Sequence, residues 1–413
     1  MTASSSTSSA LASTSSASAS TSSASSASPP TRTVGIIGDG QLGMLLCEAA
    51  PQLDLDTVML TGDRNCAAAQ KATHAIEGAM DSSEAVSALI DQCDVITYER
   101  EDIPEATVTQ LREAEAAGLV ACYPPLSAIE LLQDKAKQKL WLAECELATL
   151  PFVITNGDVA ELQQAGEKLG YPFVQKALRG GFDGRGVQLI RTEDDLGKAW
   201  PGSTMLEKFA GDFREIAVLV VRSPKGESTH FGPVDMTFEE DYSVLDTVSA
   251  PANIDKETEA AAIALAYNAV EALNGVGVFG VEMFLLADRQ VLINEIAPRV
   301  HNSGHYTIEA CASSQFEQHL RAVAGIELAS SALKSPAAMR NLLCTPALKQ
   351  EDLHRDSCTE TGSDSATIYW YGKSPARLMR KLGHVTAVAE SAEEALTATN
   401  NNWNRIQEEA RSA

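Results

Sequence analysis

The feature that most constrains the fold lies near residue 34, where an apolar run, a glycine turn and an apolar helical segment follow one another. Thr33 to Ile37 has the composition of a short buried strand, Gly38 to Gly43 supplies the turn, and Met44 to Ala50 indicates a helix. Strand, glycine turn and helix in this order are typical of the first unit of a doubly wound parallel sheet. We therefore predict an α/β protein that begins with a doubly wound unit.

Acidic residues follow a later predicted strand of the same sheet. Asp56 to Leu60 and Asp94 to Tyr98 indicate strands, and Glu99 and Glu101 come just after the second of these. Ligands of open parallel sheets bind beyond the carboxyl ends of the strands. Glu99 and Glu101 are therefore candidate ligand-binding residues.

A glycine-rich loop, Gly180 to Gly186, lies between two predicted strands at 171–176 and 187–190. Glycines let backbone amides approach a phosphate closely. Because the order is strand, loop, strand, the loop is neither a Walker A loop nor a dinucleotide fingerprint. Two interpretations stay open at this point: a flap that closes over a triphosphate, and an ordinary β-hairpin turn.

Two glutamates fall on adjacent strands of a predicted hairpin formed by residues 277–285 and 291–295. Glu282 and Glu295 interrupt runs that are otherwise apolar. A glutamate on a buried strand costs free energy unless it is paired or binds a metal. Carboxylate oxygens are the ligands that Mg²⁺ prefers. The pattern favours a metal site, and two solvated strand glutamates are the alternative.

The segment from Glu295 to His305 concentrates polar function. It holds Arg299, His301, Asn302 and Ser303 within a few residues of a predicted metal carboxylate. An arginine in such a place can clamp a phosphoryl group or an oxyanion. A lone histidine is usually a packed or surface residue, but two histidines flanking Asn-Ser-Gly favour a functional site.

The charge balance excludes several classes of protein. The 413 residues carry 32 Lys and Arg against 56 Asp and Glu, a formal net charge of −24. A general nucleic-acid binder and a polybasic membrane-surface protein both need a basic face, and no run of about 18 apolar residues predicts a membrane span. An anionic small molecule remains compatible, because a local cluster of cations overrides the global sign. Lys373, Arg377, Arg380 and Lys381 form such a cluster, with a solvated basic helix as the alternative.

The first residues have a different composition from the rest. Thr2 to Pro30 is almost entirely Ser, Ala and Thr, which predicts disorder. The basic and apolar regions of a secretory signal are missing. A plastid transit peptide is an alternative that the lack of arginine before Arg32 weakens. The cysteines are scattered without a C-x-x-C pair, which indicates thiols in a reducing compartment. We expect a cytoplasmic protein folded from about Thr33 onward.

Taken together, these motifs resemble the ATP-grasp superfamily and, within it, the N5-carboxyaminoimidazole ribonucleotide synthases, ATP-dependent carboxylases of de novo purine synthesis. The resemblance covers about residues 33–390. The most specific run is 301–305, His-Asn-Ser-Gly-His, which separates this family from formate-dependent glycinamide ribonucleotide transformylases and from biotin carboxylases. Further matching segments are 40–43, 180–186, 294–299, 314–319 and 380–384.

The resemblance implies an ATP-grasp fold of α/β type (α+β overall) in three domains. Residues 33–128 would form a Rossmann-like, pre-ATP-grasp domain, and residues 129–330 the ATP-grasp domain, with a mobile lid at about 150–210. Residues 331–413 would form a small β-rich carboxy-terminal domain that binds the phosphate of the substrate. Residues 1–32 are the expected disordered leader.

The resemblance also implies which ligand each residue would bind. Lys176, Arg299, His301, Asn302 and Ser303 would be catalytic, the last four around bicarbonate. Glu282 and Glu295 would hold Mg²⁺. Aminoimidazole ribonucleotide would contact Glu99 or Glu101, Asp183, Arg185, Lys373 and Arg380. ATP would contact Lys135, Lys176, Gly181, Phe182, Asp183, Gly184, Arg185, Gly186, Val187, Glu207, Lys208, Phe209, Ala210, Glu215, Asn294 and Glu295.

The implied reaction suits these residue types. Attack of bicarbonate on the γ-phosphorus of ATP gives carboxyphosphate, and the amine of the ribonucleotide then takes the carboxyl group. Mg²⁺, which Mn²⁺ can replace, and Lys176 would offset charge on the phosphoryl oxygens. The resemblance further implies a homodimer and a mutase on a separate chain, with no nucleic acid and no membrane as partners.

The sequence departs from the family at several positions. Asp39 stands where a third glycine is usual, and a carboxylate there would repel a phosphate bound at the turn. Val300 replaces the usual proline, and Glu239 the histidine that many bacterial members carry. Two alternatives therefore stay open: another ATP-grasp ligase such as the transformylase, and a nucleotide-binding relative without catalysis.

Overall fold

The structure is a computed structural model that describes residues 32–180, 186–239, 242–345, 358–373, 375 and 377–412. Residues 1–31 of the predicted leader and residues 181–185 of the glycine loop lie outside this range, so the expectations for them stay predictions. Among the described residues, no helix combines the length and apolarity that a membrane crossing requires.

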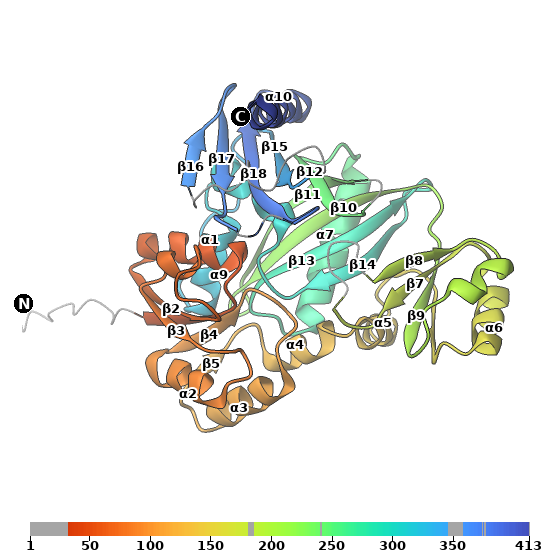
Figure 1. Cartoon of the computed structure of the whole chain (residues 1–413), viewed down its shortest axis with the longest axis horizontal. Helices are drawn as coiled ribbons and strands as arrows, with labels where there is room; N and C mark the ends of the chain where they lie inside the picture. Colours follow the sequence, from red (N-terminus) through yellow and green to blue (C-terminus); the bar gives the residue numbers. More distant parts are fainter. Residues whose placement is uncertain are drawn as a thin grey trace, which may run out of the picture. The chain divides into compact units, whose positions relative to one another are not determined.

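The amino-terminal region is a parallel sheet with the strand order β3-β2-β1-β4-β5, drawn in orange in Figure 1. The chain leaves β1 for β2 on one side and returns to β4 on the other. Ligands of doubly wound sheets bind at such a switch point. Helix α1 begins at Gln41, earlier than the predicted Met44, because Gly40 already forms the extended N-cap. The elements are β1 Arg32–Ile37, α1 Gln41–Ala49, β2 Leu55–Thr61, β3 His74–Glu77, α2 Ser83–Gln92, β4 Val95–Tyr98, α3 Glu105–Ala116, β5 Ala121–Cys122 and α4 Leu126–Leu132.

The central sheet continues into the carboxy-terminal region (Figure 1). Its nine strands, as far as the described residues show, follow the order β14-β13-β10-β11-β12-β15-β18-β17-β16. The predicted hairpin strands are present as β13 and β14, and β15 joins β12 to the last strands. The strands are β10 Phe213–Arg222, β11 Ser228–Phe238, β12 Leu245–Ala250, β13 Gly277–Leu286, β14 Val291–Ala297, β15 Ala337–Leu343, β16 Cys358–Thr361, β17 Ala366–Trp370 and β18 Lys381–Val388.

Strand β10 shows why this sheet is buried on both faces. Ile216, Val218 and Val220 point into one core with α7 (Lys256–Ala272). Ala217 and Leu219 point into a second core, which they share with α1, β1 and α9 (Gln315–Val323). Successive side chains of a strand face opposite sides, so one apolar run serves two cores. The second core ties the amino-terminal sheet to the central one.

A separate antiparallel sheet, in the order β6-β9-β7-β8, carries the strands predicted on either side of the glycine loop. It packs against α6 through Leu162, Phe173 and Leu206. Its elements are β6 Phe152–Thr155, α6 Val159–Leu169, β7 Phe173–Ala177, β8 Val187–Ile190 and β9 Thr204–Lys208. The remaining helices are α5 Lys135–Glu144, α8 Thr307–Ala310 and α10 Ala392–Ser412, the last packed on β15 and β18.

Candidate active site

Glu282 on β13 and Glu295 on β14 lie opposite each other in the antiparallel register, which confirms their predicted adjacency. Glu215 on the next strand, β10, lies close enough to be affected by both. Burial raises the pKa of Glu215 to about 8, and the charges of Glu282 and Glu295 add to the rise. Among the described residues, no group of three or more His, Cys, Asp or Glu side chains is arranged to hold a metal ion. The predicted Mg²⁺ ligands are therefore the two opposed carboxylates of Glu282 and Glu295, oxygen donors of the kind that Mg²⁺ prefers.

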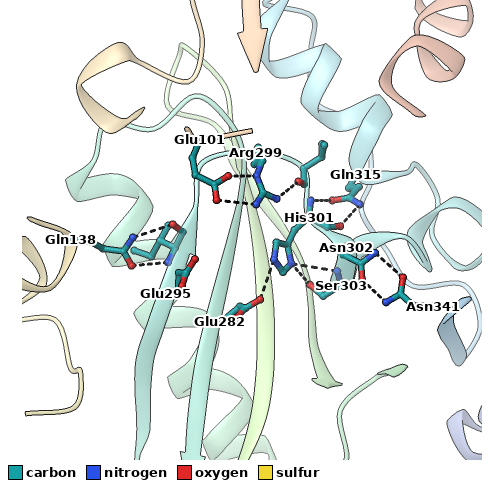
Figure 2. A network of polar contacts seen from close by, with 12 residues as sticks. Glu101, Gln138, Glu282, Glu295, Arg299, His301, Asn302, Ser303, Gln315 and Asn341 are labelled. Carbon is teal, nitrogen blue, oxygen red and sulfur yellow. Dashed lines mark hydrogen bonds and ion pairs between the residues drawn. The ribbon is translucent and has the colours of Figure 1, made fainter. Parts of the chain in front are cut away.

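Helix α5 delivers two side chains to this edge of the sheet. Asp134 caps the helix by accepting from the backbone N–H of Ala136 at 3.0 Å, and Lys135, the first helical residue, forms an ion pair with Glu295. Gln138, one turn later, accepts from the Ile296 N–H at 2.9 Å and donates to the Ile296 carbonyl at 3.3 Å. Because β14 is an edge strand, the Gln138 amide pairs backbone groups that the sheet leaves open. Figure 2 shows Gln138 beside β14.

Lys176 on β7 connects the small sheet to β14. Its Nζ donates to Asn294 Oδ1 at 3.0 Å and forms an ion pair with Glu207 Oε2 at 2.6 Å. Two residues predicted at ATP, Lys176 and Asn294, are thus in direct contact. The Glu207 side chain is buried. A ligand in the site would therefore contact the Glu207 backbone, or Lys176, but not the Glu207 carboxylate. Phe209 and Ala210, predicted to contact ATP, follow β9, and the backbone N–H of Lys208 donates to the Pro151 carbonyl.

Arg299 and Glu101 form a bidentate ion pair, although the resemblance assigned them to different ligands. The Arg299 Nε and Nη2 both donate to the Glu101 carboxylate, the second at 3.2 Å, as Figure 2 shows. Burial would raise the pKa of Glu101, but the guanidinium outweighs it and lowers the pKa to about 2. The pair joins the loop after β4 to the segment after β14, and it fixes the plane of the guanidinium.

The residues after Arg299 form a short turn that is closed by neutral hydrogen bonds. His301 Nδ1 accepts from the Ser303 N–H at 3.3 Å and contacts the Ser303 hydroxyl at 2.8 Å. The ring proton is therefore assigned to Nε2, which faces Glu282 Oε1 at 3.1 Å. Burial would raise the pKa of Glu282, but His301 and nearby lysines outweigh it and hold the pKa below its ordinary value. The turn thus rests directly against a predicted metal carboxylate.

Two buried amides hold this turn from behind. Gln315 accepts from the His301 N–H at 2.8 Å and donates to the His301 carbonyl at 2.7 Å. Asn302 and Asn341 exchange hydrogen bonds through their side chains, at 3.1 Å and 2.7 Å. Asn341 also donates to the Leu245 carbonyl at 2.9 Å. Figure 2 shows the reciprocal pair. The Asn302 amide is thereby oriented by a residue of β15.

The glycine turn after β1 is filled by a carboxylate of the protein itself. The N–H groups of Gly40 and Gly43 donate to the two oxygens of Glu99, at 2.7 Å and 2.9 Å. A Cβ at Gly40 would lie 2.7 Å from Glu99 Oε1, so any larger residue there would have to displace the carboxylate. Burial raises the pKa of Glu99, and the two amides act against that rise. Asp39 points away from this contact and accepts from the Thr61 hydroxyl at 2.8 Å.

Lys373 reaches the same turn from the carboxy-terminal region. Its Nζ donates to Gln41 Oε1 at the start of α1, and its charge acts on Glu99. The predicted substrate residues Glu99 and Lys373 are therefore brought together from opposite ends of the chain. Arg380 lies just before β18, where its Nη1 donates to the Pro375 carbonyl at 2.7 Å.

The other predicted residues are placed as follows. Gly186 accepts from the Ala177 N–H at 2.8 Å and closes the hairpin of β7 and β8, and Val187 is exposed at the start of β8. Gly181, Phe182, Asp183, Gly184 and Arg185 fall outside the described residues.

Sequence reasoning missed Gln138 and Asn341, and it did not assign a role to Gln315. One signal was present for each of the first two. Gln138 lies one helical turn after Lys135 and so shares its face of the helix. Asn341 is a polar residue inside the apolar run Ala337–Leu343, and a buried amide needs a partner.

Comparison with known proteins places these features in context. Three family models match successive parts of the chain: the ribonucleotide synthetase preATP-grasp domain (residues 31–133), the ATP-grasp domain (140–316) and the phosphoribosylaminoimidazole carboxylase carboxy-terminal domain (337–398). The chain is 36% identical over 368 residues to the N5-carboxyaminoimidazole ribonucleotide synthase of Brucella melitensis, covering 87% of this chain and 97% of that one.

Longer relatives and solved structures also match. The chain is 35% identical over 378 residues to the phosphoribosylaminoimidazole carboxylase of Candida glabrata, covering 88% of this chain and 65% of that one, so it spans about two thirds of that relative. It resembles the crystal structure of the N5-carboxyaminoimidazole synthase from Aspergillus clavatus in complex with ADP and 5-aminoimidazole ribonucleotide. The TM-score is 0.81 at 33% identity, covering 92% of this chain and 99% of that one.

Proposed function

Because this chain belongs to the family of N5-carboxyaminoimidazole ribonucleotide synthases, we propose that it carboxylates 5-aminoimidazole ribonucleotide with ATP and bicarbonate. The observation that carries the proposal is the contact of His301 Nε2 with Glu282 Oε1 at 3.1 Å. It places residues 301–305, the run most specific to the family, next to the predicted metal ligands Glu282 and Glu295. A site for a small oxyanion thus adjoins a site for a metal-bound triphosphate, as transfer of a phosphoryl group to bicarbonate requires.

ATP binds between the small sheet and β14 in this proposal. Lys135 and Lys176 face its phosphates, residues 181–187 cover them, residues 207–210 line the base and Glu215 contacts the ribose. Mg²⁺, or Mn²⁺ in its place, would be held by Glu282 and Glu295 and would offset the charge of the phosphate oxygens. Support comes from the contacts of Lys135 with Glu295 and of Lys176 with Asn294.

Bicarbonate lies among Arg299, His301, Asn302 and Ser303. Its oxygen attacks the γ-phosphorus, the bond to the β-phosphate oxygen breaks, and ADP leaves with carboxyphosphate as the other product. Arg299 orients the anion, because Glu101 holds the guanidinium plane. Carboxyphosphate then releases phosphate and CO₂ in the closed site. The substrate amine adds to the CO₂ and passes a proton to the released phosphate, which gives N5-carboxyaminoimidazole ribonucleotide.

The ribonucleotide lies against the amino-terminal switch point. Of the two acids left open by the sequence, we assign Glu99 to the substrate, because the charge of Lys373 acts on Glu99 whereas Glu101 pairs with Arg299 at the proposed bicarbonate position. Lys373 and Arg380 bind the 5′-phosphate, and Asp183 and Arg185 contact the substrate from the glycine loop. The meeting of Lys373 with Gln41 beside Glu99 supports this placement.

One assay tests the proposal. ADP release is measured with ATP, Mg²⁺ and bicarbonate, with and without aminoimidazole ribonucleotide. We expect strong stimulation by the ribonucleotide and formation of its N-carboxylated product. No stimulation would contradict the proposal, stimulation by formate with glycinamide ribonucleotide would support a transformylase, and no ADP release under any condition would indicate a binding protein.

The proposal extends to the organisation of the protein. We infer a homodimer in the cytoplasm, and domain boundaries near residues 33, 129 and 331. The free, buried thiols Cys47, Cys93, Cys122 and Cys311 support a reducing compartment, and the limits of the three family models support the boundaries. Light scattering of the purified chain, and imaging of the chain with and without residues 1–32, test the oligomer and the location.

A further inference from the structure

A second lysine of α5 lies behind the site. The Lys139 side chain is 2% exposed, and its Nζ forms an ion pair with Glu207 Oε1 at 2.6 Å. The same Nζ donates to the Thr149 hydroxyl and to the Ile293 carbonyl, the latter at 3.3 Å. The contact with Glu207 Oε1 is an ion pair, and the two hydrogen bonds of Nζ go to the Thr149 hydroxyl and the Ile293 carbonyl. At 2% exposure, the Lys139 ammonium is buried away from any ligand in the site.

Glu207 connects this buried lysine to the site. Its other oxygen, Oε2, lies 2.6 Å from Nζ of Lys176, whose side chain is 12% exposed. The order Lys139, Glu207, Lys176 thus runs from the interior toward the proposed phosphate position. Burial would raise the pKa of Glu207, but the two lysines outweigh it and hold the pKa below its ordinary value. Glu207 is therefore a carboxylate shared by two cations.

The charges of this row decide what ATP would meet. Two ammonium groups and one carboxylate leave a net positive charge, and the exposed end of the row is Lys176. Without Lys139, Glu207 would have Lys176 as its remaining partner in the row, and the pair would be neutral. A buried ion pair of that kind attracts a polyphosphate far less than an uncompensated ammonium does.

We propose that Lys139 is a positioning residue for ATP, which shares the Glu207 carboxylate so that Lys176 keeps its charge for the phosphates. The inference rests on the proposed function, because it needs ATP as the ligand at Lys176. It adds a residue that touches no ligand, and it explains why a lysine is buried at this position of α5. A purely structural lysine would hold β9 and β14 together but would leave the affinity for ATP unchanged.

The test is a charge-rescue cycle. Binding of ATP with Mg²⁺ is measured by isothermal titration calorimetry, without bicarbonate or ribonucleotide, on the wild type, Lys139→Met, Glu207→Gln and the double variant. We expect Lys139→Met to weaken ATP binding about tenfold. Adding Glu207→Gln to it removes the carboxylate that neutralises Lys176, so the double variant should bind within about threefold of the wild type. Lys137→Met, on the exposed face of α5, is the matched control and should bind as the wild type does.

Lys139→Arg keeps the charge and gives a second measurement that does not depend on the folding of the Met variant. We expect it to bind ATP within about threefold of the wild type. Wild-type affinity in Lys139→Met with a lowered melting temperature would show a purely structural role and overturn the inference. A double variant as weak as Lys139→Met, or an Arg variant as weak, would also overturn it. A wild type that fails to bind ATP would instead overturn the proposed function.

Discussion

The two halves of the site are held by different forces. On the side of α5, β7 and β14 the contacts are ionic, as in Lys135 with Glu295 and Lys176 with Glu207. On the side of the turn at 302–304 and β15 they are hydrogen bonds between neutral groups, as in Asn302 with Asn341. We call these the ionic half and the amide half.

The two halves differ in what happens when a ligand binds: side chains of the ionic half must exchange partners, whereas those of the amide half are already oriented. In the ionic half, the lysines proposed to meet phosphate already face carboxylates, so ATP and Mg²⁺ must take over existing partners. In the amide half, both groups of the Asn302 amide are oriented before any ligand arrives, and reorientation costs nothing at the moment of reaction. Changes in the ionic half should act through charge, and changes in the amide half through geometry.

The largest effect is expected in the ionic half, from Glu295→Gln. The change removes a proposed metal ligand and the partner of Lys135, so turnover should fall by at least about 100-fold. ADP release at saturating substrates measures it. Glu257→Gln on the exposed face of α7 is the control and should keep full turnover. Retained activity in Glu295→Gln would show that Glu295 is not a metal ligand.

In the amide half, Asn341→Leu should lower kcat/KM for bicarbonate by about tenfold, with a smaller effect on the KM for ATP. The buried Asn302 amide loses its partner, so the free energy of unfolding should also drop by about 1–3 kcal/mol. Kinetics and urea unfolding measure the two effects.

Met339→Leu, on the same strand and equally buried, is the volume-conserving control and should leave bicarbonate kinetics unchanged. If it lowered kcat/KM for bicarbonate as much as Asn341→Leu does, orientation of Asn302 would not be the cause.

A third change tests the carboxylate in the glycine turn. In Gly40→Ala the new Cβ would lie 2.7 Å from Glu99 Oε1 and displace it. The KM for aminoimidazole ribonucleotide should rise several-fold, with the KM for ATP unchanged. Gly62→Ala, where a Cβ meets nothing within 4 Å, serves as the control. A rise in the KM for ATP instead would place the nucleotide at this turn.

The smallest expected effect is a dependence of folding stability on pH, which we attribute to a buried neutral histidine near the amide half. His384 bonds to the Tyr371 hydroxyl at 2.7 Å and stacks on Tyr369. Burial lowers its pKa to about 3. Since the unfolded chain binds this proton near pH 6.5, stability is lost as the pH falls from about 6.5 toward 3, by up to about 1.4 kcal/mol per pH unit.

Urea unfolding at pH 7, 6 and 5 measures this slope. His384→Gln should show a shallower loss of stability than the wild type over that range. Equal slopes in the two proteins would mean that His384 is not the group that titrates.

Much of the fold could be predicted because its signals are local. Apolar strands, the glycine turn and the hairpin at 277–295 each lie within a short window, and the structure contains them all. Strand β11 was not predicted, because its apolar residues are interrupted by Gly232, Pro233 and Asp235. Helix α9 lies in the core shared by the two large sheets. The sequence did not predict this position, because a short segment does not show which distant elements it will pack against.

The sequence by itself determined the family motifs, the adjacency of Glu282 and Glu295, and the residue types at the site, because these depend on near neighbours in the chain. Only the tertiary structure decided their partners. Glu101 meets Arg299 across 198 residues, and Lys373 meets Gln41 across 332. Such pairs depend on how the sheets pack through a shared core, and no spacing along the chain encodes that. For the same physical reason Lys139, an ordinary helical lysine in the sequence, became a candidate for setting the charge at the phosphate site.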